Sequence, residues 1–164
     1  MPAELRLRPL RADECADWRR AVTEGYAAEI ETMGDTPHDA AYGKAEKDMV
    51  AVLPEGLATP GHSIFVLERD GERVGQLWLA ERTMDARTVM FVYDIEIDER
   101  HRGAGLGRWA MLLAEDAARA RGIRRIELNV FGGNWVARRL YRSLGYVERS
   151  ISMGKDLGDP PTPR

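Results

Sequence analysis

A glycine-rich turn between a strand-like and a helix-like segment is the feature that most constrains the fold. Residues 100–108 read RHRGAGLGR, with three glycines at alternate positions and arginines on both sides. Residues 88–97 before it are rich in β-branched and aromatic side chains, which is typical of a strand. After it, apolar side chains recur at three- and four-residue spacing as far as Gly122, which indicates an amphipathic helix. The sequence therefore predicts a strand, an open turn and a helix.

Such a turn is suited to binding an anion. Glycines let the backbone approach a phosphate closely, and the free N–H groups and dipole at a helix N-terminus favour negative charge. Arg102 and Arg108 offer charge-assisted contacts. The alternative is an ordinary turn whose glycines only relieve steric strain. A P-loop is excluded, because Arg108 and Trp109 follow the last glycine where that loop needs lysine and Ser or Thr, and the spacing GxGxG differs from the dinucleotide fingerprint.

The rest of the chain alternates strand and helix patterns. Asp70-Gly71 tolerates the positive φ angles of a tight hairpin turn, and residues 33–37 interrupt an otherwise helical region. The expected order is strand, helix, helix, three strands, helix, strand, helix, strand, and the last strand spans residues 146–155. This order predicts a mixed α/β sheet. We expect one domain over residues 1–157, followed by a loose tail at 158–164.

Composition excludes several classes of protein. The 164 residues are 44% hydrophobic and 31% charged, which fits one folded domain and not a disordered chain. The net charge of −3 disfavours nucleic acid as a partner. Cys15 is the only cysteine and the three histidines lack ligand spacing, so neither a disulfide nor a metal is expected. No segment matches a signal peptide or a membrane span, so we expect a cytoplasmic protein.

Two motifs together resemble the GNAT superfamily of acetyl-CoA-dependent N-acetyltransferases. Residues 102–107, RGAGLG, match its phosphate-binding signature Q/R-x-x-G-x-G/A. Residues 134–141, NWVARRLY, followed by LGY at 144–146, match a second block in which asparagine opens a short helix. The similarity covers about residues 88–155 and implies a GNAT-like acyl-CoA N-acyltransferase fold with acetyl-CoA as co-substrate. The first half agrees only in its order of elements, and such enzymes diverge there.

The resemblance also implies which residues hold the cofactor. Backbone N–H groups of the turn would bind the coenzyme A pyrophosphate, and Asn134 would contact the pantetheine arm. The strand before the turn would splay from the next strand, and its exposed backbone would pair with the pantetheine amides. The implied cofactor-binding residues are Ile95, Glu96, Ile97, Arg102, Gly103, Ala104, Gly105, Leu106, Gly107, Arg108, Asn134 and Tyr141.

Proton transfer needs an acid and a base. Tyr141 matches the family position near the coenzyme sulfur, and we expect it to be the general acid; the alternative is a packing residue. Some family members carry a glutamate that acts as the general base where this chain has Asn129. Asp94 and Glu96 are the nearest substitutes, about 7 Å apart on one strand face, where like charges raise a pKa. We expect Glu96 to be the base because it lies beside the thioester-binding backbone, unless these carboxylates pair with arginines such as Arg138 or Arg139.

The acceptor is less defined than the donor. The resemblance implies direct attack on the thioester by a primary amine of a small molecule or peptide, and Trp78 is the tryptophan expected to line its pocket. Acidic residues of the first helical region would attract a cationic amine, such as a polyamine or an aminoglycoside: Glu24, Glu29, Glu31 and Asp35. The alternative function is a catalytically silent coenzyme-A-binding sensor. An exposed edge strand at residues 146–155 favours a homodimer.

Overall fold

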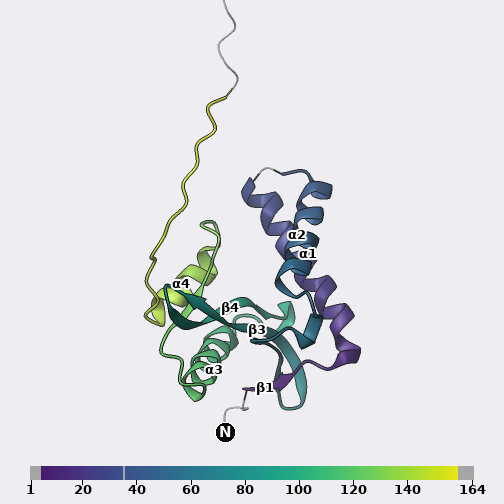
Figure 1. Ribbon diagram of the computed structural model, residues 1–164, viewed down its shortest axis with the longest axis vertical. Coiled ribbons are helices and arrows are strands. Elements are labelled where there is room, and N and C mark those ends of the chain that lie inside the picture. Colours follow the sequence, from purple (N-terminus) through teal and green to yellow (C-terminus); the bar gives the residue numbers. More distant parts are fainter. Residues whose placement is uncertain (1–4, 35, 159–164) are drawn as a thin grey trace, which may run out of the picture.

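The computed structural model describes residues 5–34 and 36–158 as a five-stranded sheet with helices on both faces (Figure 1). The strands follow the order β1-β2-β3-β4-β5; the first four pair antiparallel, and β5 runs parallel to β4. They are β1 (Leu5–Pro9), β2 (His62–Arg69), β3 (Glu72–Met84), β4 (Arg87–Ile97) and β5 (Ile126–Leu128). The helices are α1 (Cys15–Gly34), α2 (His38–Val52), α3 (Leu106–Ala120) and α4 (Trp135–Ser143). The mixed α/β fold expected from the sequence is confirmed.

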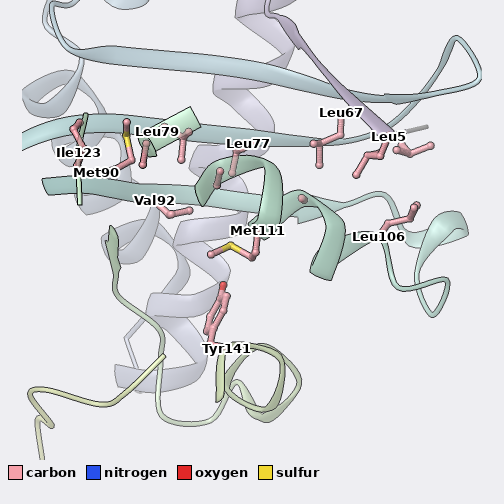
Figure 2. Packing of buried hydrophobic residues seen from close by; sticks show 14 residues of the cluster. Leu5, Leu67, Leu77, Leu79, Met90, Val92, Leu106, Met111, Ile123 and Tyr141 are labelled. Carbon is pink, nitrogen blue, oxygen red and sulfur yellow. The ribbon is translucent and has the colours of Figure 1, made fainter. Parts of the chain in front are cut away.

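Each face of the sheet has its own apolar core, because successive side chains of a strand point to opposite faces. On one face, Trp18 of α1 packs edge-on against Trp78 of β3, with ring centroids 5.3 Å apart. On the other face, Met111 of α3 belongs to one buried cluster with Leu77 and Met90 (Figure 2). The sheet is thus held between the α1–α2 pair and α3.

The β2–β3 hairpin turns at the predicted dipeptide. Asp70 and Gly71 have φ angles of 53° and 80°, the left-handed conformation that a two-residue hairpin turn requires. The break between the first two helices also lies where the sequence predicts it, since α1 ends at Gly34 and α2 begins at His38. The sequence was sufficient to locate this turn and this break, because the conformation of each depends on residues adjacent in sequence.

β4 bends in the middle and opens on one side. The register pairs Trp78 with Asp94 and Leu79 with Val92, so Tyr93 is the extra residue of a β-bulge. A bulge disrupts the ladder and increases the local twist. β5 pairs with β4 only at Met90, Phe91 and Val92, and it is three residues long. Beyond the bulge, the edge of β4 that faces β5 has no strand partner within the described residues.

The strand expected at residues 146–155 is not formed, and this prediction was wrong. Tyr146 turns back towards Tyr141, and the chain then runs away from the sheet (Figure 1). Val147, Ile151 and Met153 keep strand spacing but are exposed. A strand needs partner backbone for its N–H and C=O groups, and β5 is only three residues long. The argument for a dimer through an edge strand at residues 146–155 therefore fails. Of the tail expected at residues 158–164, only Gly158 lies within the described residues.

Candidate active site

The glycine-rich turn presents a row of free backbone N–H groups. Gly103 and Gly105 have φ angles of 80° and 75°, which glycine adopts without strain, and Gly105 is the N-cap of α3. In the described part of the chain, the N–H groups of residues 103–107 donate no hydrogen bond. The N–H groups of Arg102 and Arg108 instead donate to the carbonyls of Glu99 and Gly105. The expected cradle therefore narrows to five consecutive N–H groups at a helix N-terminus, an arrangement suited to an anion.

The arginine side chains beside the cradle contact protein groups. Arg102 Nε donates to the carbonyl of Ile97 at 2.9 Å, and its Nη2 lies 3.5 Å from Glu96 Oε1. Arg108 Nη1 donates to Ser143 Oγ at 3.0 Å. These contacts connect the turn to the end of β4 and to α4. The backbone N–H groups of residues 103–107 are free donors of the cradle, and each guanidinium keeps further N–H groups beyond these contacts.

A close contact between strands fixes the open end of β4. Gly75 of β3 lies opposite Ile97, and a Cβ on Gly75 would collide with the carbonyl oxygen of Glu96. A glycine is therefore required for β3 to approach this part of β4. Ile95, Glu96 and Ile97 lie in the segment without a partner on the β5 side, which is the backbone expected to pair with pantetheine.

Helix α4 brings Tyr141 to the site. Asn134 is its N-cap, and Asn134 Oδ1 accepts a hydrogen bond from the Ala137 N–H at 3.1 Å. Tyr141 lies two turns further on, is 9% exposed, and points from α4 towards Met111 (Figure 2). Val136 in the first turn of this helix is 85% exposed, so its side chain faces away from the core. The contact of Asn134 with the cofactor stays a prediction.

Three carboxyl groups from two elements interact with one another, and two of them, Asp94 and Glu29, also interact with Tyr141. Asp94 and Glu96 lie on β4, and Glu29 lies on α1. Burial raises the pKa of Asp94 to about 6, and the charges of Glu96 and Glu29 contribute. Burial and the charge of Glu96 raise the pKa of Glu29. Burial also raises the pKa of Tyr141 to about 12, with contributions from Asp94 and Glu29. The first half of the chain therefore contributes a carboxyl group to the site.

A contact near the end of α1 explains how this helix reaches α4. A Cβ on Gly133, in the loop before α4, would lie 3.4 Å from Met33 Sδ of α1. The last turns of α1 therefore lie beside the loop that leads into α4. Side chains from both halves of the chain can then face the same space.

The two candidate bases differ in their surroundings. Asp94 is half-buried, and its Oδ2 accepts a hydrogen bond from Gln76 Nε2 at 2.7 Å. The side chain of Glu96 is 49% exposed and lies near Arg102. The arginine pairing left open for these carboxylates thus occurs at Glu96, whereas Arg138 pairs with Glu148. Asp94 is thus the more buried of the two carboxyl groups, and Glu96 is the one paired with an arginine.

The structure places the other residues predicted for the acceptor side in different surroundings. Glu31 pairs with His38 on α2, and Glu24 is exposed on α1, while Asp35 lies outside the described residues. Trp78 is 4% exposed and packs in the core, so it is not an open pocket wall. Sequence reasoning missed Gln76, although a glutamine within the apolar run of residues 74–80 was a usable signal.

Residues 5–34 and 36–158 provide neither a cluster of metal ligands nor a membrane-spanning helix. No group of three or more His, Cys, Asp or Glu side chains there is arranged to hold a metal ion. Across the same residues, every helix is too short or too polar to cross a bilayer.

A mixed sheet that opens beside a helix N-terminus with free backbone N–H groups, together with a buried tyrosine on α4, is compatible with an acyl-CoA-dependent acyltransferase. The family model described as "Acetyltransferase (GNAT) family" matches residues 19–146. The chain belongs to this family, and the resemblance seen in its two motifs is confirmed. It is an acyltransferase of a family that uses acetyl-CoA.

Relatives and solved structures agree with this assignment. An uncharacterized N-acetyltransferase of Bacillus subtilis (strain 168), YycN, is 32% identical over 152 residues, 92% of this chain and 97% of that protein. YdgE of the same organism, also an uncharacterized N-acetyltransferase, is 30% identical with the same coverage. The crystal structure of YycN superposes with a TM-score of 0.90 over 95% of this chain and 100% of that chain, at 30% identity. Aminoglycoside N-acetyltransferase AAC(6′)-Iy in complex with CoA shares the fold, with a TM-score of 0.59 at 15% identity over 97% of this chain and 98% of that one.

Proposed function

We propose that this protein transfers the acetyl group of acetyl-CoA to a primary amine of a small molecule or peptide by direct attack on the thioester. The proposal rests on one observation. Two sets of backbone groups suited to the cofactor lie in the same region as two side chains that can transfer protons. The free N–H groups of residues 103–107 and the open edge of β4 are suited to pyrophosphate and pantetheine. In the proposed complex, Asp94 and Tyr141 would lie beside the thioester, and the charge of Asp94 contributes to the raised pKa of Tyr141.

Asp94 serves as the proton acceptor in this proposal. An alkyl ammonium must lose a proton before its nitrogen can attack the thioester carbon. Because burial raises the pKa of Asp94 to about 6, the carboxyl group is ionised at neutral pH and still basic enough to take a proton, directly or through water. Glu96, expected from the sequence, is the alternative base. The new C–N bond then replaces the C–S bond.

Tyr141 serves as the donor to the leaving thiolate. Burial raises the pKa of Tyr141 to about 12, so its hydroxyl keeps its proton throughout the neutral range. The same shift makes the hydroxyl a weaker acid than a free phenol. Tyr141 therefore stabilises the thiolate first by a hydrogen bond and transfers the proton as the C–S bond breaks.

The first experiment is a calorimetric titration with acetyl-CoA, with ATP and NAD as controls. We expect micromolar binding of acetyl-CoA and no binding of either control. A panel of amines, including spermidine, tyramine and a lysine peptide, is then assayed for release of the coenzyme A thiol. Absence of acetyl-CoA binding, or equal binding of ATP, would overturn the proposal.

We further propose that residues 1–157 act as one N-acetyltransferase domain. Support comes from the sheet, in which β1 from the start of the chain pairs with β2, and α3 packs against both β1 and β4. The cytoplasmic location expected from the sequence stays a prediction. The homodimer also stays a prediction, but without the support of an edge strand at residues 146–155.

A further inference from the structure

A buried glutamine next to the site is hydrogen-bonded at both ends of its amide. Gln76 on β3 is 2% exposed. Its Nε2 donates to Asp94 Oδ2 at 2.7 Å, and its Oε1 accepts from Arg73 Nη2 at 2.9 Å. Arg73 is partly exposed, and its Nε lies 3.9 Å from Asp98 Oδ2. A guanidinium, an amide and a carboxylate therefore form one chain through the interior.

These two bonds fix the orientation of the amide. An amide turned by half a rotation would place its oxygen against the Asp94 carboxylate and its NH₂ against the Arg73 guanidinium, so both contacts would be repulsive. The cation also polarises the amide, which makes the NH₂ group a stronger donor to the carboxylate. Arg73 therefore acts on Asp94 through Gln76, without touching it.

The other groups that face Asp94 do not favour its charged form. Glu96 on β4 and Glu29 on α1 oppose it by like charge, and burial opposes it most strongly. Tyr141 on α4 is uncharged at neutral pH, since its pKa is raised to about 12. Among the described residues, the hydrogen bond from Gln76 is the interaction that stabilises the Asp94 carboxylate.

We propose that Gln76 is a positioning residue for the transfer reaction, holding the Asp94 carboxylate by Oδ2 under the influence of Arg73. Asp94 Oδ1 makes no hydrogen bond to the described residues and is the oxygen left to accept a proton. The inference rests on the proposed function, because it assumes that Asp94 is the base. It adds a role for two residues that contact neither substrate in the proposed reaction.

The test is a titration of Asp94 by NMR in protein labelled with ¹³C at the aspartate carboxyl carbons, which requires no acceptor. The Asp94 signal is identified by its loss in Asp94→Asn. In wild type we expect a midpoint near the pKa of about 6. Gln76→Met keeps the side-chain length but removes the donor, so we expect the midpoint to rise by about one pH unit. Arg73→Met leaves Gln76 in place and should raise it by less.

Thr59→Val is the matched control. Thr59 is buried, and its hydroxyl accepts a hydrogen bond from the Glu55 N–H away from Asp94. This variant should lower stability without moving the Asp94 midpoint. An Asp94 midpoint within about 0.2 pH unit of wild type in Gln76→Met would overturn the proposal. If Gln76→Met does not fold, an unchanged Asp94 midpoint in the partly exposed Arg73→Met variant would overturn the proposal instead.

A kinetic measurement separates this inference from the proposed function. With an amine acceptor from the panel, the acidic limb of the kcat/KM profile should move with the NMR midpoint, while acetyl-CoA affinity stays within about twofold of wild type. A purely structural role would lower the rate at every pH equally. A limb that stays in place while the midpoint moves overturns the role of Gln76. If the wild-type protein does not bind acetyl-CoA, the proposed function itself is overturned. The NMR shift then stands as a separate result.

Discussion

The two sides of the site are built from different groups. On the cofactor side, residues 103–107 offer backbone N–H groups, held in place by glycines with positive φ angles. On the acceptor side, carboxyl groups of Glu29, Asp94 and Glu96 come from α1 and β4, which are distant in sequence. Backbone donors recognise a phosphate whatever side chains surround them, whereas side chains can be exchanged without changing the fold. The donor is therefore defined by this architecture, and the acceptor by individual residues.

Asp94→Asn should separate the two sides most strongly. The amide has the size of the carboxyl group but takes no proton, so we expect kcat to fall by about 10²–10⁴-fold. Acetyl-CoA affinity should be unchanged, because the cradle is untouched. Turnover and calorimetry on the same samples measure both effects. Glu96→Gln is the matched control, and a loss of turnover confined to Glu96→Gln would assign the base to Glu96 instead.

Tyr141→Phe removes the proposed donor to the thiolate and keeps the ring packing. We expect kcat to fall by about 10²-fold, with acetyl-CoA affinity and the melting temperature close to wild type. Tyr146→Phe is the control, because its ring lies 5.8 Å from Tyr141 and its hydroxyl bonds to Glu115. Undiminished turnover in Tyr141→Phe would show that this hydroxyl is not the acid.

A substitution at Gly105 should weaken acetyl-CoA binding and leave turnover nearly unchanged, the reverse of the pattern expected for Asp94 and Tyr141. An alanine at φ 75° is strained by about 1–2 kcal/mol, so the turn must change shape. We expect Gly105→Ala to weaken acetyl-CoA binding by about tenfold, measured by calorimetry, while kcat at saturating cofactor changes little. Gly25→Ala in α1, where a Cβ meets nothing within 4 Å, should leave binding unchanged. Equal affinities in the two variants would contradict a backbone cradle.

The same contrast explains what the sequence could predict. The Asp70-Gly71 turn and the cradle depend on positive φ angles within a few residues, so they are visible in sequence. The contact of Gln76 with Asp94 depends on the register of β3 against β4 and on the bulge at Tyr93, which no local pattern specifies. Helix α1 was predicted, but its approach to β4 through Glu29 was not.

The expected strand at residues 146–155 failed for a related reason. Alternation of apolar residues shows that a segment is compatible with a strand, but pairing requires a partner edge of matching length. β5 provides only Ile126 to Leu128. In the structure Arg149 Nη1 reaches Glu127 Oε1 at 3.1 Å, a contact between side chains without a backbone ladder. Local pattern therefore predicted the glycine-rich turn and the start of α3 well, and the strand after α4 poorly.

Acid should destabilise the junction between β1 and the start of α1. Glu14 lies just before α1, and its bond with Arg8 of β1 lowers its pKa from 4.5 to about 2. A lowered carboxyl pKa stabilises the fold above about pH 4.5, and that stabilisation is lost as pH falls towards 2. After allowance for solvent, Glu14→Gln should cost about 1 kcal/mol at pH 7 and little near pH 2. Urea unfolding measures the difference; a cost independent of pH would contradict the ion pair, and Glu24→Gln is the exposed control.

The smallest effect is expected from Glu29, and it tests whether the acceptor side selects charge. If the acceptor is a cationic amine, its ammonium approaches a site where Glu29, Asp94 and Glu96 interact, with Arg102 near Glu96. Glu29→Gln removes one charge and leaves the base in place. We expect the KM for spermidine to rise by about two- to fivefold, and the KM for acetyl-CoA to stay constant. Glu31→Gln is the matched control, because Glu31 is already paired with His38. Equal KM values in both variants and wild type would mean that α1 contributes shape rather than charge, and the acceptor would then be sought among neutral amines.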